Sequence, residues 1–394
     1  MAYISLNCEF RVFNVLPLVV FCALCVDFTR TLLRDLCNGR LPSVYIDRFR
    51  NHCSDASGSW FDSFTDLTLS NFISTCCSFD LAKGKEILTL QRECHARRLD
   101  ALLRVLLVVQ QLLQENRHES KRDIYYIYPA FFQEQSVVDR AINDICIILQ
   151  CSRHHLNVVS VGKGLVMGWL RFSEAGRKFD CINNPNTVYP IPVHVEEVKD
   201  IISVADYVLI VEKESEGTAA LSSQFSIISV SASSAESLDL SLNHDGRGYP
   251  DVSTRRFLQL LIGKLRLPVY GLVDCDPHGF DILTTYRFGS MQMAYDAKFL
   301  RLPEVRWIGA FPSDLEKFSL PPQCLLPLTT EEKAKTEAML QRCYLLREVP
   351  QWRSEVELLL QKGVKFEIEA LSVHSISFLT EEYIPSKIQA GLYI

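Results

Sequence analysis

The stretch PVYGLVDCDPHGFDI, residues 268–282, carries an apolar run that ends in two closely spaced aspartates and a helix start. The apolar run is typical of a buried strand. Asp274 and Asp276 follow it two residues apart, and on an extended segment such side chains point the same way. Pro277 and Gly279 then break the strand, so a helix is expected to begin there. The pattern predicts two carboxylates held together at the end of a strand.

A second apolar run lies upstream, in DYVLIVEKE (206–214), and it ends in Glu212. Between the two runs, STRRFLQLLIGKL (253–265) has the apolar spacing of a helix. Strands that alternate with helices indicate an α/β domain with a parallel sheet, whose ligands gather beyond the carboxyl ends of the strands. Carboxylate oxygens without histidine or cysteine partners favour Mg²⁺ over zinc. Glu212, Asp274 and Asp276 are therefore candidate Mg²⁺ ligands, although a lone acid at a strand end is commonly solvated.

The first half of the chain has a different pattern, with helices in succession. RRLDALLRVLLVVQQLLQENRH (97–118) repeats apolar residues with a period of about 3.6, which predicts a long helix. Ser120 and Asp123 have the spacing of a capping box, so KRDIYY (121–126) is expected to form the first turns of a short helix. EQSVVDRAINDICIILQC (134–151) predicts a third helix.

Two β-rich runs in LNVVSVGKGLVMGWLRF (156–172) meet around Gly162 and Gly164, which predicts a hairpin. Three helices followed by a hairpin is the order of a winged helix, whose third helix can enter the DNA major groove. An ordinary three-helix cluster with a β-ribbon has the same pattern and remains open. Cations fall on the helices, their ends and the hairpin, where phosphate contacts are usually made: Lys121, Arg122, Arg140, Arg153, Lys163 and Arg171.

The composition is that of a globular protein with room for two packed domains, since the chain has 394 residues and 48% hydrophobic content. The net charge of −6 gives no overall cationic field, so nucleic-acid binding would depend on local patches. The 14 cysteines lack a paired zinc spacing and are expected to be reduced thiols of an intracellular protein. The apolar run at 15–26 is shorter than the roughly 20 residues that span a bilayer, and a buried helix is favoured over a signal peptide.

Six motifs occur in a fixed order along the chain: SKRDIYY (120–126), GKGLVMG (162–168), VEKE (211–214), GRGYPD (246–251), VDCDPHGFDI (273–282) and YRFGSMQMAYD (286–296). The set closely resembles the topoisomerase VI A-subunit family, and within it the plant-type meiotic double-strand-break transesterases. The resemblance runs from about residue 30 to the C-terminus. It implies a winged-helix (CAP-like) DNA-binding domain that carries a nucleophilic tyrosine, followed by a Toprim domain that carries the metal-binding acids.

The resemblance also implies roles for single residues. Tyr126, the second tyrosine of RDIYY, matches the family nucleophile, whereas an isolated tyrosine would be interpreted as a core or interface residue. Glu212, Asp274 and Asp276 match the acids that hold Mg²⁺. A phenol of ordinary pKa, about 10, is mostly protonated at neutral pH. Arg122 lies four residues before Tyr126 on the same helix face and is the candidate to stabilise the phenolate.

Partners follow from the same resemblance. Lys163 in GKGL and Arg247 in GRGYPD match family positions that line the channel for double-stranded DNA, and each would otherwise be interpreted as a solvated charge. In the family the tyrosine of one protomer meets the acids of another, so a twofold dimer cuts both strands. The relatives act in the meiotic nucleus with a B-type, ATPase-like partner, a topoisomerase VI B-like subunit. In plants they also act with a paralogous A-type chain. No membrane partner is expected.

The predicted organisation has five parts, with domain limits taken from the motifs and the resemblance. They are an unmatched apolar N-terminus (1–27), a helical extension and loop (28–96), the winged-helix domain (97–175), the Toprim domain (195–350) and a C-terminal helical segment (351–394).

Residues 215–245 depart from the family, because they are rich in serine and lack Lys and Arg where relatives have an amphipathic helix and a buried strand. FSIISV (225–230) could replace the strand. One hypothesis is an active Mg²⁺-dependent DNA transesterase. The other is a catalytically inactive isoform, a DNA-binding or assembly component that cannot hold Glu212 opposite Asp274 and Asp276. A nuclease that uses water is less favoured, since it leaves RDIYY unused.

Overall fold

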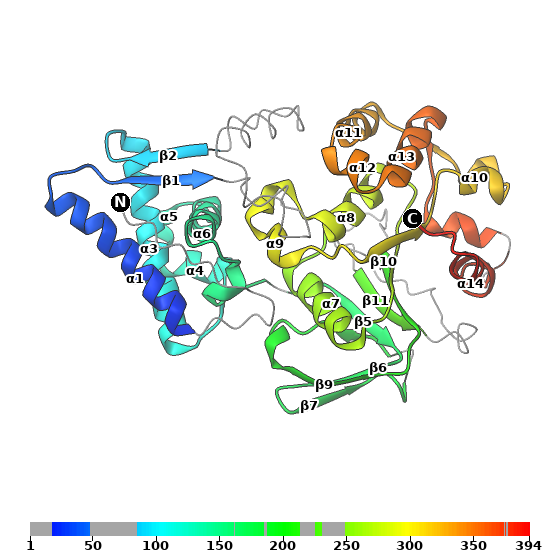
Figure 1. The fold of residues 1–394 in the computed structure, drawn as a ribbon, viewed down its shortest axis with the longest axis horizontal. Helices are drawn as coiled ribbons and strands as arrows, with labels where there is room; N and C mark the ends of the chain where they lie inside the picture. The colour runs from blue at the N-terminus through cyan, green and yellow to red at the C-terminus, as the bar shows by residue number, and fades with distance from the viewer. Residues whose placement is uncertain are drawn as a thin grey trace. The chain divides into compact units, whose positions relative to one another are not determined.

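The computed structural model describes residues 18–47, 85–160, 162–184, 187–212, 225–230, 249–373, 375 and 377–394. Within them the chain forms two compact units, the first from 18–47 and 85–159, the second from 160 onward (Figure 1). The first unit is mainly helical, and the second is built on a mixed sheet. The loop predicted within 28–96 and most of the segment 215–245 lie outside the described residues.

The first unit is built around the long helix α3 (Glu93–Glu115), which confirms the helix predicted from the apolar period. Its buried residues recur at helical spacing, and both α1 (Leu18–Cys37) and α6 (Gln135–Leu149) pack against α3. The other elements of this unit are β1 (Ser43–Asp47), β2 (Lys85–Thr89), β3 (Glu119–Ser120), α4 (Lys121–Ile127), α5 (Pro129–Phe132), η2 (Arg153–Leu156) and β4 (Val158–Val159).

A buried charge network joins α3 to its neighbours. The Arg98 guanidinium lies 2.7 Å from a carboxylate oxygen of Asp144 on α6 and 2.7 Å from one of Glu86 on β2. Asp144 is fully buried. A charge removed from water is costly unless it is paired and hydrogen-bonded, so this network fixes how α3, α6 and β2 meet.

The hairpin predicted at 156–172 is wrong. β4 pairs with β3 in parallel, whereas β5 (Leu165–Gly168) pairs with strands of the second unit's sheet. Gly164 does not reverse the chain: a Cβ there would collide with the Thr254 side chain and with Ile191. The glycine serves a close approach rather than a turn. The hairpin in this region comes later, between β6 (Leu170–Glu174) and β7 (Arg177–Asp180).

The second unit has a six-stranded sheet in the order β13-β12-β10-β11-β5-β8. Three neighbours run parallel, as the strand–helix alternation predicts: β10 (Tyr207–Glu212), β12 (Val269–Leu272) and β13 (Val305–Gly309). β8 (Tyr189–Pro190) forms the edge beside β5. β11 (Phe225–Val230) is the strand expected from FSIISV, but it runs antiparallel to β10. The parallel sheet is therefore wrong at β11, since an apolar run does not specify the direction in which a strand runs.

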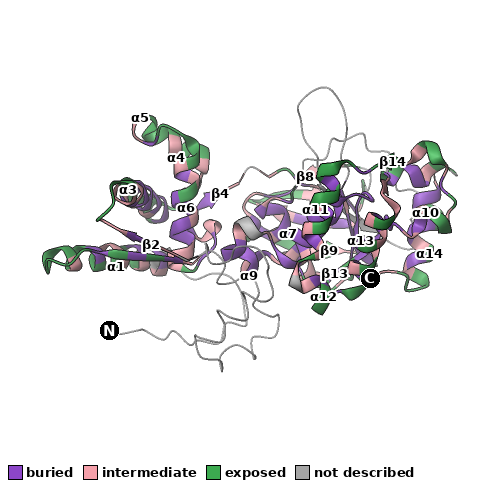
Figure 2. Ribbon diagram, turned by 90° about the horizontal axis from the view of Figure 1, so that it is seen from above, coloured by how far each residue is buried: buried purple, intermediate pink, exposed green. Residues whose placement is uncertain are grey.

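Both faces of this sheet are covered. Val208 and Ile210 of β10 belong to one apolar core, which includes Phe257, Phe280 and Trp352, while Leu209 belongs to the other, which includes Phe366 and Tyr383. Figure 2 shows the buried residues of α7 (Val252–Leu265) and α13 (Pro350–Lys362) in purple. Continuous burial explains why the strands read as unbroken apolar runs.

The remaining elements of the second unit lie outside the six-stranded sheet. They are η3 (Val195–Glu197), β9 (Val198–Ser203), α8 (Pro277–Phe288), η5 (Met291–Asp296), α9 (Ala297–Leu300), α10 (Asp314–Lys317), η6 (Pro322–Cys324), β14 (Leu326–Pro327), α11 (Thr330–Leu340), α12 (Cys343–Arg347), β15 (Val364–Lys365), η7 (Ile368–Val373), η8 (Phe378–Tyr383) and α14 (Ile384–Gln389).

Two expectations from composition can be compared with the described residues. The nine cysteines whose side chains are described carry free thiols. Cys25, in the apolar run at 15–26, is fully buried in α1, and burial raises the pKa of its thiol to about 12. Among the described helices, none combines the length and apolar character needed to cross a membrane.

Candidate active site

Tyr126, the predicted nucleophile, lies on the short helix α4 and is 57% exposed. The helix forms where the sequence predicts it, because Ser120 and Asp123 make a reciprocal capping box: the Ser120 hydroxyl accepts from the Asp123 amide at 3.2 Å, and Asp123 accepts from the Ser120 amide at 3.0 Å. Ile124 is fully buried and anchors the helix, which packs on α6. The fold thus presents the phenol at the surface of the first unit.

Arg122 lies beside Tyr126, as the i, i+4 spacing predicts. Its Nη2 is 3.4 Å from the Tyr126 hydroxyl, at the long end of a hydrogen bond, and its guanidinium carbon is 5.7 Å from the centre of the ring. Both side chains are exposed. The structure therefore places a guanidinium directly beside the Tyr126 hydroxyl.

The neighbouring tyrosines differ from Tyr126 in their contacts. The Tyr125 hydroxyl donates to the Gln133 carbonyl at 3.2 Å. Tyr128 meets Phe132 edge-on, with ring centres 6.4 Å apart, but is 44% exposed, so it is only partly a packing residue. Lys121 lies 3.8 Å from Asp139 on α6 and keeps 19% of its side chain exposed, which ties α4 to α6. Exposure alone therefore does not distinguish Tyr126 from Tyr128, whereas the nearby guanidinium does.

The three predicted metal ligands lie at the carboxyl edge of the parallel strands. Glu212 ends β10, and Asp274 and Asp276 follow β12, the neighbouring strand. Val211 is the register partner of Leu272, so Glu212 is one residue, and Asp274 two residues, beyond a paired position. The exposed fractions of Glu212, Asp274 and Asp276 are 3%, 5% and 8%. The fold brings these acids to one buried edge.

Hydrogen bonds hold the two aspartates in place. Asp276 caps α8, because its Oδ1 accepts from the Gly279 amide at 2.6 Å. Asp274 Oδ1 accepts from the Ile368 amide at 2.8 Å. A Cβ at Gly279 would collide with the Asp274 backbone, so a glycine is needed where the helix turns back over the strand end. These contacts restrict how the two carboxylates can rotate.

The donor set fits a hard divalent cation. Buried carboxylates are costly unless a cation or hydrogen bonds compensate them. Mg²⁺ suits this donor set, since it keeps several waters and takes only one or two carboxylates directly. Cys275, between the aspartates, packs in the apolar core that includes Phe366 and Tyr383, and burial raises the pKa of its thiol well above the ordinary value.

The motif GKGL meets the start of α7 through the backbone. The Lys163 amide donates to Asp251 Oδ2 at 2.8 Å, and Asp251 also caps α7 through the Thr254 amide at 2.8 Å. The Lys163 side chain is exposed. The structure therefore joins GKGL to the last residue of GRGYPD, although Arg247 of that motif lies outside the described residues.

A polar cluster at α8 has no counterpart among the predicted residues. Tyr249 donates its hydroxyl to Asp281, and Arg342 Nη1 lies 2.7 Å from Asp281 Oδ1. Burial opposes ionisation of Asp281, but Arg342, the Tyr249 hydroxyl and Lys335 outweigh it and hold the pKa of the carboxyl below its ordinary value. Lys335 also lies 2.9 Å from His278 Nδ1. GRGYPD could have indicated Tyr249, but no local pattern links Asp281 to cations so far along the chain.

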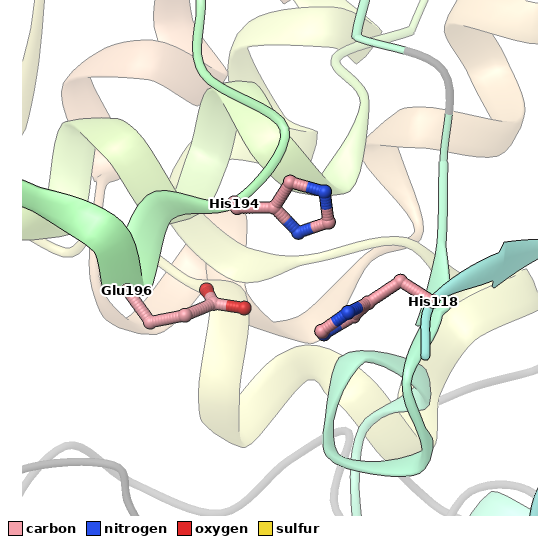
Figure 3. A group of neighbouring side chains, drawn as sticks. All are labelled: His118, His194 and Glu196. Atoms are coloured by element: carbon pink, nitrogen blue, oxygen red, sulfur yellow. The ribbon is translucent and has the colours of Figure 1, made fainter. Parts of the chain in front are cut away.

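His194 and Glu196 flank the start of η3 in the second unit, where Figure 3 draws them as sticks. Glu196 pairs with Arg256 of α7 at 2.9 Å, which gives it a structural partner. His118, drawn in the same picture, belongs to the first unit, so we do not count the three side chains as one metal site.

Sequence comparisons match both units. The family model for the Toprim domain of topoisomerase 6 A-subunits and Spo11 matches residues 207–388, which include Glu212, Asp274 and Asp276. The family described as "Type IIB DNA topoisomerase" matches residues 97–158, which include Arg122 and Tyr126.

Individual relatives cover most of the chain. It is 59% identical to the meiotic recombination protein SPO11-1 of Arabidopsis thaliana over 363 residues, 92% of this chain and 93% of that protein. It is 35% identical to the human meiotic recombination protein SPO11 over 300 residues, 76% and 73% of the two chains. It is also 35% identical to the A-subunit of DNA topoisomerase 6 from Arabidopsis thaliana over 297 residues, 74% and 66% of the two chains.

Proposed function

The chain belongs to the Spo11 and topoisomerase 6 A-subunit family, and we propose that it makes the DNA double-strand breaks of meiotic recombination by topoisomerase-like transesterification. The observation that carries the proposal is the pairing of exposed Tyr126 with Arg122 at 3.4 Å, in a chain that is 59% identical to a plant SPO11-1 over 92% of its length.

The proposed reaction exchanges one phosphodiester for another. The Tyr126 Oη attacks a backbone phosphorus, a phosphotyrosine bond forms at the 5′ end, and the bond to the 3′ oxygen breaks. The phenol loses its proton and the departing 3′ oxygen gains one, which leaves a 3′ hydroxyl. Arg122 stabilises the phenolate before attack. No ATP is consumed in this step, because the phosphotyrosine conserves the ester bond.

Glu212, Asp274 and Asp276 are proposed to hold Mg²⁺, which when bound would neutralise phosphate charge at the scissile group. The protein's own part is to keep the carboxylates at fixed positions. The inactive-isoform alternative is less favoured, since it requires that Glu212 be lost from the edge beside Asp274 and Asp276, and β10 pairs with β12 up to Val211 and Leu272. A nuclease that uses water gives no role to the pair of Tyr126 and Arg122.

The first unit is proposed to be a winged-helix DNA-binding domain, with α3, α4 and α6 as its helices. Lys121 of this unit and Lys163 of the second unit are proposed as DNA contacts. Arg247 is proposed as a further DNA contact. Cutting both strands requires two copies, because each carries one nucleophile, and a twofold homodimer or a pair with a paralogous A-type chain meets that need. A topoisomerase VI B-like subunit is the proposed partner, and the nucleus the proposed location.

The test is capture of the covalent product. The full chain, its B-type partner, duplex DNA and Mg²⁺ are incubated and then denatured, and DNA bound to protein through its 5′ end is measured. We expect an adduct with the wild type and none with Tyr126→Phe. Tyr128→Phe is the matched control, because it removes a hydroxyl from a second exposed tyrosine two residues away and should leave the adduct intact. An adduct that persists in Tyr126→Phe would overturn the assignment of the nucleophile.

A further inference from the structure

The loop that carries the two aspartates is bonded to β13 on one side. The Val273 amide donates to the Gly309 carbonyl at 2.9 Å, and the Ala310 amide donates to the Val273 carbonyl at 2.7 Å. Both bonds lie past the last paired residues of β12 and at the end of β13. The position of residues 309–310 therefore sets where the chain leaves β12 for Asp274.

On its other side the same loop is bonded to the C-terminal segment. Cys275 and Phe366 exchange backbone hydrogen bonds, at 2.9 Å from the Cys275 amide and 3.3 Å from the Phe366 amide. Two residues later the Ile368 amide donates to Asp274 Oδ1 at 2.8 Å. The aspartate loop is thus clamped between the end of β13 and a segment about 90 residues further along the chain.

A buried polar triad joins the end of β13 to α14, the last helix. Asp314, the first residue of α10, accepts on its Oδ2 from the Phe311 amide at 2.9 Å, from the Tyr383 hydroxyl at 2.5 Å and from Lys387 Nζ at 2.7 Å. Asp314 and Lys387 are each 1% exposed and Tyr383 is fully buried. α10 and α14 lie at the same end of the second unit in Figures 1 and 2.

The triad also fixes the backbone that bonds the aspartate loop. A Cβ at Gly309 would collide with the Tyr383 ring and hydroxyl, so the two residues are in direct contact. Lys387 Nζ lies 3.7 Å from the centre of the Phe311 ring, and this contact helps to hold the residues that follow Gly309. A buried ion pair contributes little net stability compared with apolar packing, but its directional bonds permit one arrangement of the groups around it.

We infer that Asp314, Tyr383 and Lys387 are positioning residues for the metal-binding loop: they hold residues 309–311, which in turn hold Val273 and the aspartates. None of the three touches the reacting atoms. The inference rests on the proposed Mg²⁺ site, and it assigns to the C-terminal helix a role in setting the spacing of Asp274 and Asp276 rather than only in covering the sheet.

The inference predicts a loss of metal affinity without a loss of the fold. Mn²⁺, which shares the hard-oxygen preference of Mg²⁺, is titrated into the full chain and its free form is followed by electron paramagnetic resonance. Tyr383→Phe removes only the hydroxyl and should weaken Mn²⁺ binding about tenfold, the lower end of the range for residues that support metal ligands. Tyr207→Phe is the matched control, because it removes the hydroxyl of another largely buried tyrosine, at the amino end of β10 and thus at the end opposite Glu212.

A second variant separates positioning from stability. Asp314→Asn with Lys387→Met removes both charges of the buried pair, so neither is left unpaired and the chain is expected to fold. It should still bind Mn²⁺ about tenfold more weakly than the wild type, and higher metal concentrations should restore binding. A purely structural role predicts wild-type affinity in this folded double variant, and that result would overturn the inference.

Asp276→Asn shows whether a negative result contradicts the positioning role alone or the proposed metal site as well. If Asp276→Asn loses Mn²⁺ binding while Tyr383→Phe and the double variant bind like the wild type, the metal site stands and the positioning role is wrong. If Asp276→Asn binds Mn²⁺ as tightly as the wild type, the proposed metal site itself is wrong, and the positioning role falls with it.

Discussion

The two parts of the proposed active site are built in opposite ways. Tyr126 is 57% exposed on a helix of seven residues, whereas Glu212, Asp274 and Asp276 are 3–8% exposed at the edge of a sheet that is covered on both faces. A nucleophile has to reach a phosphate in DNA, and an exposed short helix allows that. Acids that share a cation have to keep a fixed spacing, and a packed strand edge provides it. Within one chain, the exposed helix gives Tyr126 access to a substrate, and the packed sheet edge keeps the acids at a fixed spacing.

Substitutions in the two regions should therefore have different effects. Changes at α4 should alter chemistry with little effect on global stability, because few buried contacts are lost. Changes around the aspartate loop should alter metal binding, stability or both, because every group there is packed or hydrogen-bonded. The variants at Asp276 and Arg122 are followed by adduct yield and melting temperature, and those at Lys387 and Ser120 by stability alone. Equal sensitivity of the two regions to substitution would contradict the comparison.

The largest effect is expected from Asp276→Asn. The amide oxygen can still accept from the Gly279 amide and cap α8, so the melting temperature should stay close to that of the wild type. Loss of the charge should lower the yield of covalent adduct roughly 10²–10³-fold, the cost typical of one electrostatic group at a reacting centre. Asp276→Ala is the companion variant: it should lose the adduct equally and also about 1 kcal/mol of stability with the cap. Near-normal cleavage by Asp276→Asn would exclude this acid from the site.

The second prediction concerns pH and the buried pair beneath the loop. Burial, only partly offset by Asp314, lowers the pKa of Lys387 from an ordinary 10.5 to about 8 in the folded chain. Between these values the unfolded chain binds more protons than the folded one, so the contribution of Lys387 to the free energy of unfolding rises with pH, by up to about 3 kcal/mol. Lys387→Met should lack this rise between pH 8 and 10.

The measurement is the difference between the wild-type and variant melting curves across that pH range, because thiols and tyrosines that titrate there are common to both proteins. Lys362→Met serves as the control: its ammonium lies 2.8 Å from Glu316, which is 80% exposed, and should not change the slope. Parallel pH profiles for the wild type and Lys387→Met would show that the lysine does not titrate in this window.

Local patterns predicted much of both half-sites. The capping box at Ser120, the apolar period of α3 and the acids at the ends of β10 and β12 are each encoded by a few neighbouring residues, and the structure contains all of these features. The role of Gly164 was mistaken for a turn because the atoms that exclude a Cβ there belong partly to Thr254, on a helix far along the chain. The spacing of residues along the sequence does not reveal such close contacts between distant segments.

For the same reason, local sequence patterns did not predict the groups that support the acids. Lys387 and Asp314 are 73 residues apart, and Ile368 and Asp274 are 94 residues apart. An isolated lysine in a short C-terminal helix is ordinarily interpreted as a solvated charge. Only its contacts with Asp314 and with the Phe311 and Tyr383 rings in the folded chain reveal that it is buried. The direction of β11 was likewise hidden, because an apolar run does not state which neighbour it will join.

The third prediction returns to the exposed region. Arg122→Ala removes the guanidinium beside the Tyr126 hydroxyl and should lower the rate of adduct formation about tenfold, with no change in melting temperature, since both side chains are solvent-exposed. Arg97→Ala is the control for net charge, because Arg97 is 82% exposed on α3 and pairs with Glu93 within the helix. Equal loss in the two variants would mean that general attraction to DNA, rather than the contact with Tyr126, explains the effect.

The smallest effect is expected from Ser120→Ala, which tests whether α4, the helix of the proposed nucleophile Tyr126, is held locally. The change removes the hydroxyl that accepts from the Asp123 amide at 3.2 Å, a cap worth about 1 kcal/mol. A helix of seven residues has little stability of its own and depends on its cap and on buried Ile124. The opening should therefore be confined to α4: amides of residues 123–127 should exchange about fivefold faster, which is roughly 1 kcal/mol, while amides of α3 keep their protection.

Ser120→Thr keeps an equivalent hydroxyl and should exchange like the wild type. Ser136→Ala, in the first turn of α6, removes a hydroxyl that bonds Glu134 and should leave α4 unaffected. If Ser120→Ala instead lowers protection throughout α3 and α6, α4 is part of the same cooperative core as those helices. In that case the nucleophile would be held as rigidly as the acids, and the contrast between an exposed, locally supported phenol and a packed carboxylate edge would not hold.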